Sequence, residues 1–403
     1  MQVVLYEDGS ERTFGPLTLL RPAFDLRCGR FTLLEKLERG RPDWRVALVA
    51  RPGLRDVVAL EHPGRGVDSL DDGPTVLLSA TTVVDDELLD RLGDLSADSL
   101  LRDGERVVGA YVTSGARALA GSRGSPDLAS LGLPVAKGVS PRTVRYPWDL
   151  VAETASEIAL DARLVDGRGE VRGELHERAC LISPEGVTVG QGSAVGPGVV
   201  LDASAGDVLI GRDVRIMPNA VITGPVSIGD GSLVKPGARL SGGTSVGPVC
   251  KVGGEVSASV LQSHSNKQHD GYLGNSFVGS WVNLGAGTDT SDLRNDYAKV
   301  RVEIGGSVVE TGSLSVGAVI GDHSKTAIGT KLNTGSVVGA FCNVFPGQFP
   351  PKSIPSFSWG TSGGFVRYDR ERAIDTARRV MARRGVELSR AREALIRSVY
   401  EGA

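Results

Sequence analysis

The sequence predicts an α/β domain over residues 1–150, followed by a β-solenoid over residues 181–348. The first supporting pattern is a period of six, in which an aliphatic residue stands at every sixth position from Ile210 to Val252. The second is a set of continuous apolar strands that alternate with helix-like segments in the first half. A period of six fits neither a helix nor simple strand alternation, and it is typical of solenoids whose short strands each bury one aliphatic side chain. Strands that alternate with helices predict βαβ units.

Two further runs extend the six-residue pattern. The register begins at Val189 and slips by three residues before Ile210. It returns in a run where only the threonine is not aliphatic: Val302, Val308, Leu314, Ile320, Thr326, Leu332, Val338 and Val344. Gly follows many of these residues, and it tolerates a tight corner better than a residue with a Cβ. Polar interruptions at residues 261–275 and 288–299 are predicted to be loops on a binding face.

The other elements follow from apolar runs and helical patterns. Buried strands are predicted at residues 3–6, 46–49 and 75–78, and helices at residues 31–37 and 85–92. Residues 151–180 form a linker that continues a connecting helix at 146–160. Residues 349–403 begin as a proline-rich extended stretch and end in two amphipathic helices, at 369–384 and 387–400. We expect these helices to pack over the open end of the solenoid and to protect its strand edges.

Composition limits the partners. The chain has 403 residues and a net charge of −3, so no basic field favours nucleic acid. The N-terminus lacks the layout of a signal peptide, and no apolar run is long enough to span a bilayer. The four cysteines are far apart and are expected to be reduced: Cys28, Cys180, Cys250 and Cys342. We therefore expect a cytoplasmic protein that binds neither nucleic acid nor membrane.

The densest chemistry lies between residues 264 and 299. A single histidine is more often a structural hydrogen-bonding residue than a catalyst. His269, however, stands in a polar segment beside Lys267, Asp270 and Tyr272. A neutral imidazole in such a setting can accept a proton from an amine nucleophile, with a carboxylate fixing its tautomer.

Two motifs in this region carry a family resemblance. Residues 269–274 and 282–288 resemble the acetyltransferase half of the bifunctional UDP-N-acetylglucosamine pyrophosphorylase/glucosamine-1-phosphate N-acetyltransferase family. The whole chain resembles a group of sugar nucleotidyltransferases through further runs at residues 252–256, 265–271, 321–326 and 354–360. The resemblance implies a Rossmann-like nucleotidyltransferase domain and a left-handed β-helix of hexapeptide repeats. It also implies a homotrimer with the acyl-CoA site between subunits.

The resemblance assigns roles residue by residue. His269 matches the general base, and Tyr272 matches a residue that contacts the sugar phosphate. Asn283 matches a residue that orients the sugar, and Ala286 matches the position where backbone approaches the thioester of acetyl-CoA, the co-substrate. Ordinary loop packing explains Tyr272 and Asn283 equally well.

Two positions depart from the family pattern. Asp292 stands where the family has a second Asn, and Ser257 replaces a phosphate-binding Lys. Because Lys acts on phosphate as a point charge and reaches from several positions, Lys267, Lys251 or Lys299 could supply the missing charge. The departures leave the amino-sugar substrate open.

The nucleotidyltransferase motifs of the first half are degenerate. The Gly-rich signature is absent, and the strand at residues 75–78 ends in Ser-Ala rather than Gly-Asp. Arg21, Asp25 and Arg27 could form a replacement site, although a structural Arg–Asp pair explains them with fewer assumptions. Asp85 and Asp86 could bind metal but are more often helix-capping residues. Mg²⁺ is expected only if this domain is active.

Three functions remain open. The first is a CoA-dependent N-acetyltransferase acting on an amino-sugar phosphate such as glucosamine-1-phosphate, with sugar-1-phosphate nucleotidyl transfer as a second activity. The second is a nucleotidyltransferase-like regulatory or assembly protein without catalysis. The third is a β-helix hydratase holding zinc through His264, His269 and His323, whose spacing does not match that family. The leading prediction requires no metal ligand.

Overall fold

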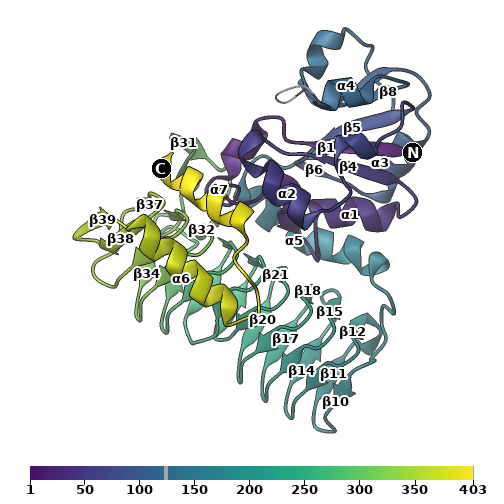
Figure 1. The fold of residues 1–403 in the computed structure, drawn as a ribbon. Coiled ribbons are helices and arrows are strands. Elements are labelled where there is room, and N and C mark those ends of the chain that lie inside the picture. The colour runs from purple at the N-terminus through teal and green to yellow at the C-terminus, as the bar shows by residue number, and fades with distance from the viewer. Residues whose placement is uncertain (122–125, 403) are drawn as a thin grey trace.

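The computed structural model describes residues 1–121 and 126–402. An α/β domain lies against one side of an elongated β-helix, and the C-terminal helices fill the angle between them (Figure 1). No helix among the described residues has the length and apolar character needed to cross a membrane. All four cysteines are free, and Cys180 is the exposed one.

The N-terminal domain is built on a five-stranded sheet in the order β4-β1-β5-β8-β7. β1 (Gln2–Tyr6) pairs in parallel with β4 (Arg45–Val49) and β5 (Thr75–Ser79), which confirms the three predicted strands. β8 (Arg106–Val112) runs antiparallel to β5 and to β7 (Ser99–Asp103). This antiparallel edge is absent from the sequence prediction, although a two-residue loop that begins with glycine, here Gly104-Glu105, is a common hairpin turn.

Helices cover this sheet and begin at ordinary capping residues. α1 (Leu33–Gly40) starts with a capping box, and α3 (Asp86–Gly93) starts at Asp85, whose carboxylate accepts the Leu88 N–H at 2.8 Å. Asp85 is therefore a cap, as the simpler interpretation held. The remaining elements of the domain are α2 (Arg55–Glu61), α4 (Ala116–Gly121), β2 (Arg27–Cys28), β3 (Phe31–Thr32), β6 (Thr82–Val83) and β9 (Arg142–Thr143).

The second half is a left-handed parallel β-helix with three faces, as predicted. The nine-stranded face comprises β12 (Val187–Val189), β15 (Val208–Ile210), β18 (Val226–Ile228), β21 (Thr244–Val246), β24 (Val260–Leu261), β27 (Phe277–Val278), β32 (Val319–Ile320), β35 (Val337–Val338) and β37 (Ser353–Ile354). The eleven-stranded face comprises β10 (Glu174–Leu175), β13 (Ala194–Val195), β16 (Arg215–Ile216), β19 (Leu233–Val234), β22 (Lys251–Val252), β25 (Asn266–Lys267), β28 (Asn283–Leu284), β33 (Lys325–Thr326), β36 (Asn343–Val344), β38 (Ser358–Thr361) and β39 (Gly364–Arg367). The six-stranded face comprises β11 (Cys180–Ile182), β14 (Val200–Asp202), β17 (Val221–Thr223), β20 (Arg239–Ser241), β23 (Glu255–Ser257) and β26 (Tyr272–Gly274). The inward aliphatics form one separate core.

The interruption predicted at residues 261–275 is wrong. These residues form a regular coil, in which Lys267 of β25 pairs with Val252 of β22. Successive strands of the nine-stranded face are 18 residues apart from Val226 to Thr244, but 15 from Ser245 to Val260 and 17 from Val260 to Phe277, and a lysine occupies the inward position. Both features break the six-residue aliphatic pattern without breaking the coil.

The insertion predicted from residue 288 is present, but it is longer than expected. β29 (Asp289–Thr290) stacks on β34 (Lys331–Leu332), and between them the chain forms a hairpin of β30 (Arg301–Ile304) and β31 (Ser307–Glu310). The predicted register from Val302 is therefore wrong in its first three positions, since Val308 is 66% exposed. Six is a multiple of two, so an alternating hairpin can imitate the period of a solenoid.

The C-terminal helices do not cap the solenoid, contrary to the prediction. α6 (Arg370–Ala382) and α7 (Arg390–Glu401) pack along its side, and their apolar residues share one core with the N-terminal domain. The antiparallel hairpin of β38 and β39 closes the end of the eleven-stranded face instead. The helices lie where they can bury apolar surface against both domains at once.

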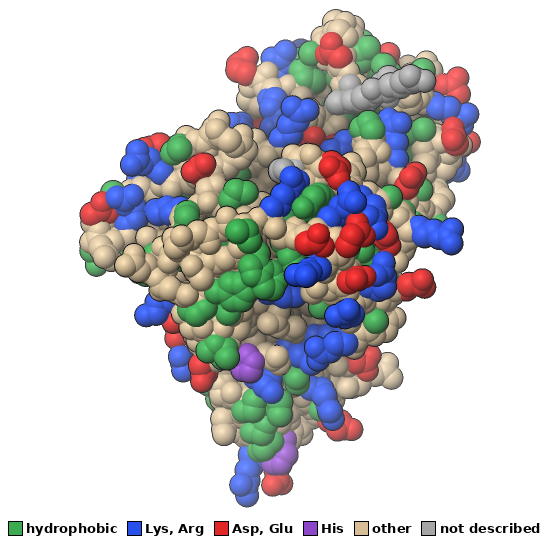
Figure 2. Space-filling view, turned by 60° about the vertical axis from the view of Figure 1, so that its left-hand side comes forward, with side chains coloured by type: hydrophobic (Ala, Val, Ile, Leu, Met, Phe, Trp, Pro, Cys, Tyr) green, Lys and Arg blue, Asp and Glu red, His purple; other side chains and the backbone are tan. Residues whose placement is uncertain are grey.

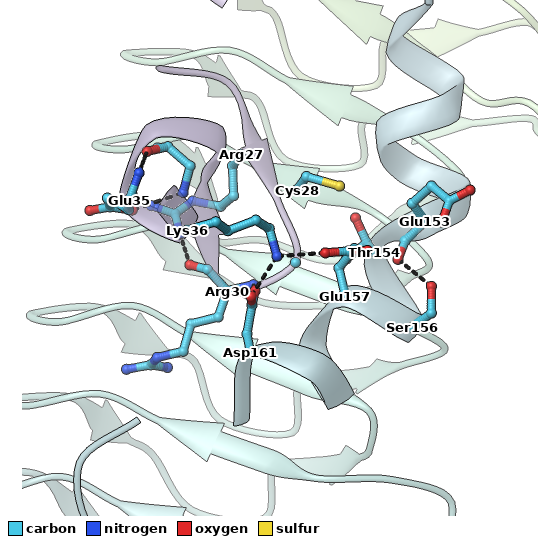
Figure 3. A network of polar contacts seen from close by, with 12 residues as sticks. Arg27, Cys28, Arg30, Glu35, Lys36, Glu153, Thr154, Ser156, Glu157 and Asp161 are labelled. Atoms are coloured by element: carbon cyan, nitrogen blue, oxygen red, sulfur yellow. Dashed lines mark hydrogen bonds and ion pairs between the residues drawn. The ribbon is translucent and has the colours of Figure 1, made fainter. Parts of the chain in front are cut away.

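A buried ion cluster joins α1 to the connecting helix α5 (Pro147–Asp161). The Lys36 ammonium lies 2.7 Å from Glu157 and 2.5 Å from Asp161, and all three side chains are at most 2% exposed (Figure 3). Arg142 pairs with the second oxygen of Glu157 at 2.6 Å. α5 also contacts the nine-stranded face, so this cluster fixes the N-terminal domain on the solenoid.

Candidate functional site at the His269 corner

His269 lies at the corner where β25 of the eleven-stranded face turns into β26 of the six-stranded face. We call this edge the His269 corner. Its imidazole is exposed, whereas Lys267, two residues earlier, is 1% exposed and points inside the coil. The Lys267 ammonium donates to the carbonyl oxygens of His269 at 2.6 Å and Gly253 at 3.3 Å. Burial lowers the pKa of Lys267 to about 8, although Asp289 and Asp270 oppose the shift.

Lys267 therefore cannot be the substrate ligand that the sequence analysis suggested. Its ammonium is enclosed by the coil and saturates carbonyl groups of the turn that carries His269. Because unpaired buried carbonyls are costly, this contact fixes the backbone on which the imidazole stands.

Ala286 occupies the same corner one coil further along. The N–H of Gly287 donates to the Asp270 carbonyl at 3.0 Å, so the two turns lie directly against each other. The Ala286 carbonyl accepts the N–H of Gly329 at 2.8 Å. Within residues 1–121 and 126–402, the Ala286 N–H itself has no hydrogen-bond partner. An imidazole and a free backbone donor thus stand on successive coils of one edge, whose backbones are separated by one strand spacing of about 4.8 Å.

Tyr272 lies beside His269 on the six-stranded face and is held by Asp292. The phenol donates to Asp292 at 3.0 Å, and Asn275 donates to the same carboxylate oxygen at 2.7 Å. Burial and the Asp292 carboxylate raise the pKa of Tyr272, which keeps the phenol protonated. Gly274 lies beneath this pair, where a Cβ would clash with both Tyr272 and Asp292. The Asp at position 292 is thus a partner of Tyr272.

Asn283 lies on the other side of the corner, on the eleven-stranded face. The Asn266 amide donates to its side-chain oxygen at 3.3 Å, and Arg384 from the loop after α6 donates to Asn266 at 2.8 Å. Lys325 stands in register with Asn283 on the next coil. Sequence reasoning quoted Asn266 and Lys325 within motifs but assigned them no role, and Arg384 could not be linked to them without the fold.

The positive charge near the site comes from several elements. The pKa of Lys251 is lowered, first by Arg384 and then by burial, Arg383 and Lys235. Lys251 stands in register with Asn266, the residue that Arg384 contacts, so the two cations lie on the same part of the eleven-stranded face. Lys299, by contrast, is exposed on the segment that leads into the β30–β31 hairpin, and no ion pair joins it to another described residue.

The histidines proposed as zinc ligands do not meet. His264 and His323 belong to a column of stacked rings at another corner of the solenoid. The ring centroids of His264 and Trp281 are 4.1 Å apart, and those of His323 and Phe341 are 4.7 Å apart. Burial lowers the pKa of His264 to about 4 and that of His323 well below its usual range. No group of three or more His, Cys, Asp or Glu among the described residues is arranged to hold a metal. The column contacts α7 through an edge-to-face contact between Phe357 and Tyr400, whose ring centroids are 4.8 Å apart.

The candidate residues of the first half lie at the contact between domains. Arg21 forms an ion pair with Asp322 of the solenoid. The Asp25 carboxylate lies 3.1 Å from His62, and its backbone carbonyl accepts the Gln262 amide at 2.8 Å. The Gln262 oxygen in turn accepts the N–H of Arg27 at 3.0 Å. Arg21 and Asp25 therefore do not pair with each other; each has a partner of its own.

A second polar cluster, missed by the sequence analysis, stands at the carboxyl ends of β1 and β5, where open α/β sheets bind ligands. Asp8 accepts the hydroxyl of Ser79 at 2.9 Å and pairs with Arg106 at 3.0 Å. Burial raises the pKa of Glu7 to about 7, although Arg51, 2.6 Å away, opposes the shift. In the sequence, the signal for this cluster is that Glu7 and Asp8 directly follow an apolar strand.

This cluster does not fit the Mg²⁺ of nucleotidyl transfer. The carboxylates of Glu7 and Asp8 are already bound by arginines and by N–H and O–H donors. No second acidic residue follows β5, which ends in Ser79. We therefore assign no metal-dependent step to this domain.

Comparisons with known proteins agree with the two-part fold. Residues 3–169 match the family model described as sugar nucleotidyl transferase, and residues 207–242 match the bacterial transferase hexapeptide model. The bifunctional sugar-1-phosphate nucleotidylyltransferase/acetyltransferase of Sulfurisphaera tokodaii is 36% identical over 25% of this chain and 25% of its own. The bifunctional protein GlmU of Acidithiobacillus ferrooxidans is 33% identical over 46% of this chain and 39% of its own.

The chain thus spans between 25% and 39% of the length of these curated relatives, which are transferases. Among solved structures, UDP-N-acetylglucosamine acyltransferase of Francisella novicida aligns over 54% of this chain and 73% of its own, with 16% identity and a TM-score of 0.27. The chain is thus similar to sugar nucleotidyl transferases over residues 3–169 and to bacterial transferase hexapeptide repeats over residues 207–242.

Proposed function

We propose that the His269 corner transfers an acetyl group from acetyl-CoA to the amine of an amino-sugar phosphate, such as glucosamine-1-phosphate. One observation carries the proposal: an exposed imidazole and an unpaired backbone N–H, that of Ala286, stand on successive coils of one edge. The names of the relatives support the class of reaction, and this chain's residues supply its chemistry.

The reaction needs a base and an oxyanion donor. His269 removes a proton from the amine as nitrogen attacks the thioester carbonyl of acetyl-CoA. The Ala286 N–H stabilises the oxygen of the tetrahedral intermediate, and collapse of that intermediate expels the CoA thiolate, which takes up the proton. Neither a metal nor a covalent enzyme intermediate is required.

The neighbouring side chains position the acceptor. Tyr272, held protonated by Asp292, offers a hydroxyl on one side of His269, and Asn283 offers an amide on the other. The cation cluster that includes Lys251 and Arg384 attracts a phosphate. In this chain that cluster replaces the lysine that the family has at the position of Ser257.

A second subunit completes the site. The His269 corner is a convex edge, so one chain alone cannot exclude water from the reacting atoms. Hydrophobic side chains are exposed over the solenoid (Figure 2), and Ile328, in the coil beyond Ala286, is 75% exposed. We infer a homotrimer in which a neighbouring solenoid covers this edge.

The test is CoA release from acetyl-CoA with glucosamine-1-phosphate and other amino-sugar phosphates. His269→Asn should lower kcat by about 10²–10⁴-fold, the usual contribution of a general base. His176→Ala is the matched control, because His176 is exposed on the same edge in the first coil, and its activity should equal that of the wild type. Equal activity of His269→Asn and the wild type would exclude His269 as the base.

Sedimentation tests the trimer separately. A monomer at the concentration of an active assay would refute the composite site while leaving the chemistry of His269 intact.

A further inference from the structure

A cleft of 450 Å³ lies between the N-terminal domain and the first coils of the solenoid. Its first wall is the segment from β2 to α1. Its second wall is the linker after α5, and its third is formed by the glycine corners Gly190, Gly211 and Gly229. The volume is in the range of pockets that enclose a small-molecule ligand. The cleft is remote in the fold from the His269 corner, which lies on another edge of the solenoid.

Three arginines of the N-terminal domain line this cleft without a carboxylate partner. Within the described part of the chain, no ion pair is formed by Arg27, Arg30 or Arg39. Arg27 is 8% exposed, and its Nε is buried without a hydrogen-bond partner. Arg39 lies over the ring of Phe31 at 4.3 Å, and Arg30 lies over the same ring at 5.7 Å. The same ring therefore contacts both guanidinium groups.

Arg30 reaches across to the solenoid. Its guanidinium donates to the Leu209 carbonyl and the Ser227 hydroxyl, both at 3.1 Å. It extends away from the Lys36 cluster (Figure 3). Burial lowers the pKa of Arg30 to about 10; the Asp230 and Asp161 carboxylates oppose this shift, whereas the charges of Arg27 and Arg39 add to it. A bound anion would offset the repulsion among these positive charges and raise the pKa of Arg30 again.

The acidic residues of the cleft form their ion pairs or helix caps elsewhere, and Asp230 reaches Arg30 only through its longer-range charge. Arg172 forms ion pairs with both Asp166 and Glu170, each at 2.7 Å. Arg212 forms an ion pair with Asp230 at 3.2 Å. Glu35, the remaining carboxylate of the cleft, caps α1. The N-terminal wall thus carries an excess of positive charge.

We propose that this interdomain cleft binds a phosphorylated small molecule through Arg27, Arg30 and Arg39. Guanidinium groups recognise phosphate oxygens by paired hydrogen bonds, and a diphosphate can engage more than one of them. Because both domains form the cleft, the bound ligand stabilises their docked arrangement. The proposal is independent of acyl transfer at His269.

Isothermal titration calorimetry of the full chain in 0.15 M salt tests the proposal with three probes: inorganic pyrophosphate, glucose-1-phosphate and UDP. The wild type should bind at least one of them, and Arg39→Ala and Arg30→Met should weaken that binding at least ten-fold. Arg39 is exposed, so its substitution leaves folding intact. Arg215→Ala removes an exposed arginine on the eleven-stranded face, outside the cleft, and should bind as the wild type does.

The outcomes are distinct. Tightest binding of UDP identifies a nucleotide site, and tightest binding of glucose-1-phosphate identifies a sugar-phosphate site. Absence of heat with all three probes overturns the proposal. So does an unchanged Kd in Arg39→Ala and Arg30→Met, or equal weakening in Arg215→Ala.

Discussion

Removing the Lys36 ammonium should destabilise the protein far more than removing an exposed ion-pair partner. In Lys36→Met the apolar stem remains, but the two contacts at 2.7 and 2.5 Å are lost. Glu157 keeps Arg142 as a partner, whereas among the described residues Asp161 keeps only the backbone N–H of Arg30, at 2.8 Å. Asp161 is thus left as a buried charge without a counterion. Breaking a buried pair in this way costs about 3–5 kcal/mol.

The destabilisation caused by Lys36→Met should depend on pH. Burial raises the pKa of Asp161, and Lys36 opposes that shift, so the pKa rises further when Lys36 is replaced. The folded variant then binds a proton more tightly than the unfolded chain does. The stability that this proton contributes is complete below the pKa of Asp161 in the unfolded chain and is lost as the pH rises through its folded pKa. The difference from the wild type should therefore be larger at pH 8 than at pH 5.5.

Urea denaturation at these two pH values measures the effect. Arg163→Ala is the control, because Arg163 forms a pair with Asp86 in which the side chains are 37% and 52% exposed, and such pairs contribute less than about 1 kcal/mol. Lys36→Met/Asp161→Asn should recover part of the loss, since it removes the unpaired charge. A loss below about 1 kcal/mol, or one independent of pH, would refute the role given to this cluster.

Two further predictions concern the site and the ring column. In Gly274→Ala, the added methyl group must displace Tyr272 and Asp292, so acetyl transfer should fall at least ten-fold. Gly66→Ala is the control, because Gly66 has a negative φ and no atom lies within 4 Å of its added Cβ; equal activity of the two variants would contradict the positioning role. His323→Phe replaces a buried imidazole whose Nδ1 has no partner, and it should stabilise the protein increasingly as the pH falls from 7.5 to 5. Because the folded pKa of His323 is low, its imidazole takes up a proton only in the unfolded chain as the pH is lowered, so the wild type becomes less stable at lower pH. Thermal denaturation of the two proteins between pH 7.5 and pH 5 measures this difference, and a difference that did not grow as the pH fell would contradict the explanation.

Much of the fold was predictable because its signals are local. The inward aliphatics from Ile210 to Val252 repeat at each strand, so the sequence alone reveals the coil. The caps at Asp85 and Asp369 mark helix starts in the same way. At the candidate site, the motif around His269 was recognisable, because its residues belong to two successive coils and lie near one another in the chain.

The tertiary structure decided which neighbours each polar side chain has. Lys267 follows the polar pattern of its motif, yet the register of β25 places it inside the coil. Arg21 finds its counterion at Asp322, 301 residues away, and no local pattern encodes such a pair. The ring column at His323 and the arginine cleft at Arg27 arise only when the two domains and the C-terminal helices are packed together. Sequence periodicity determines which face of a strand is buried, whereas the charges and rings that meet across domains depend on packing between distant segments.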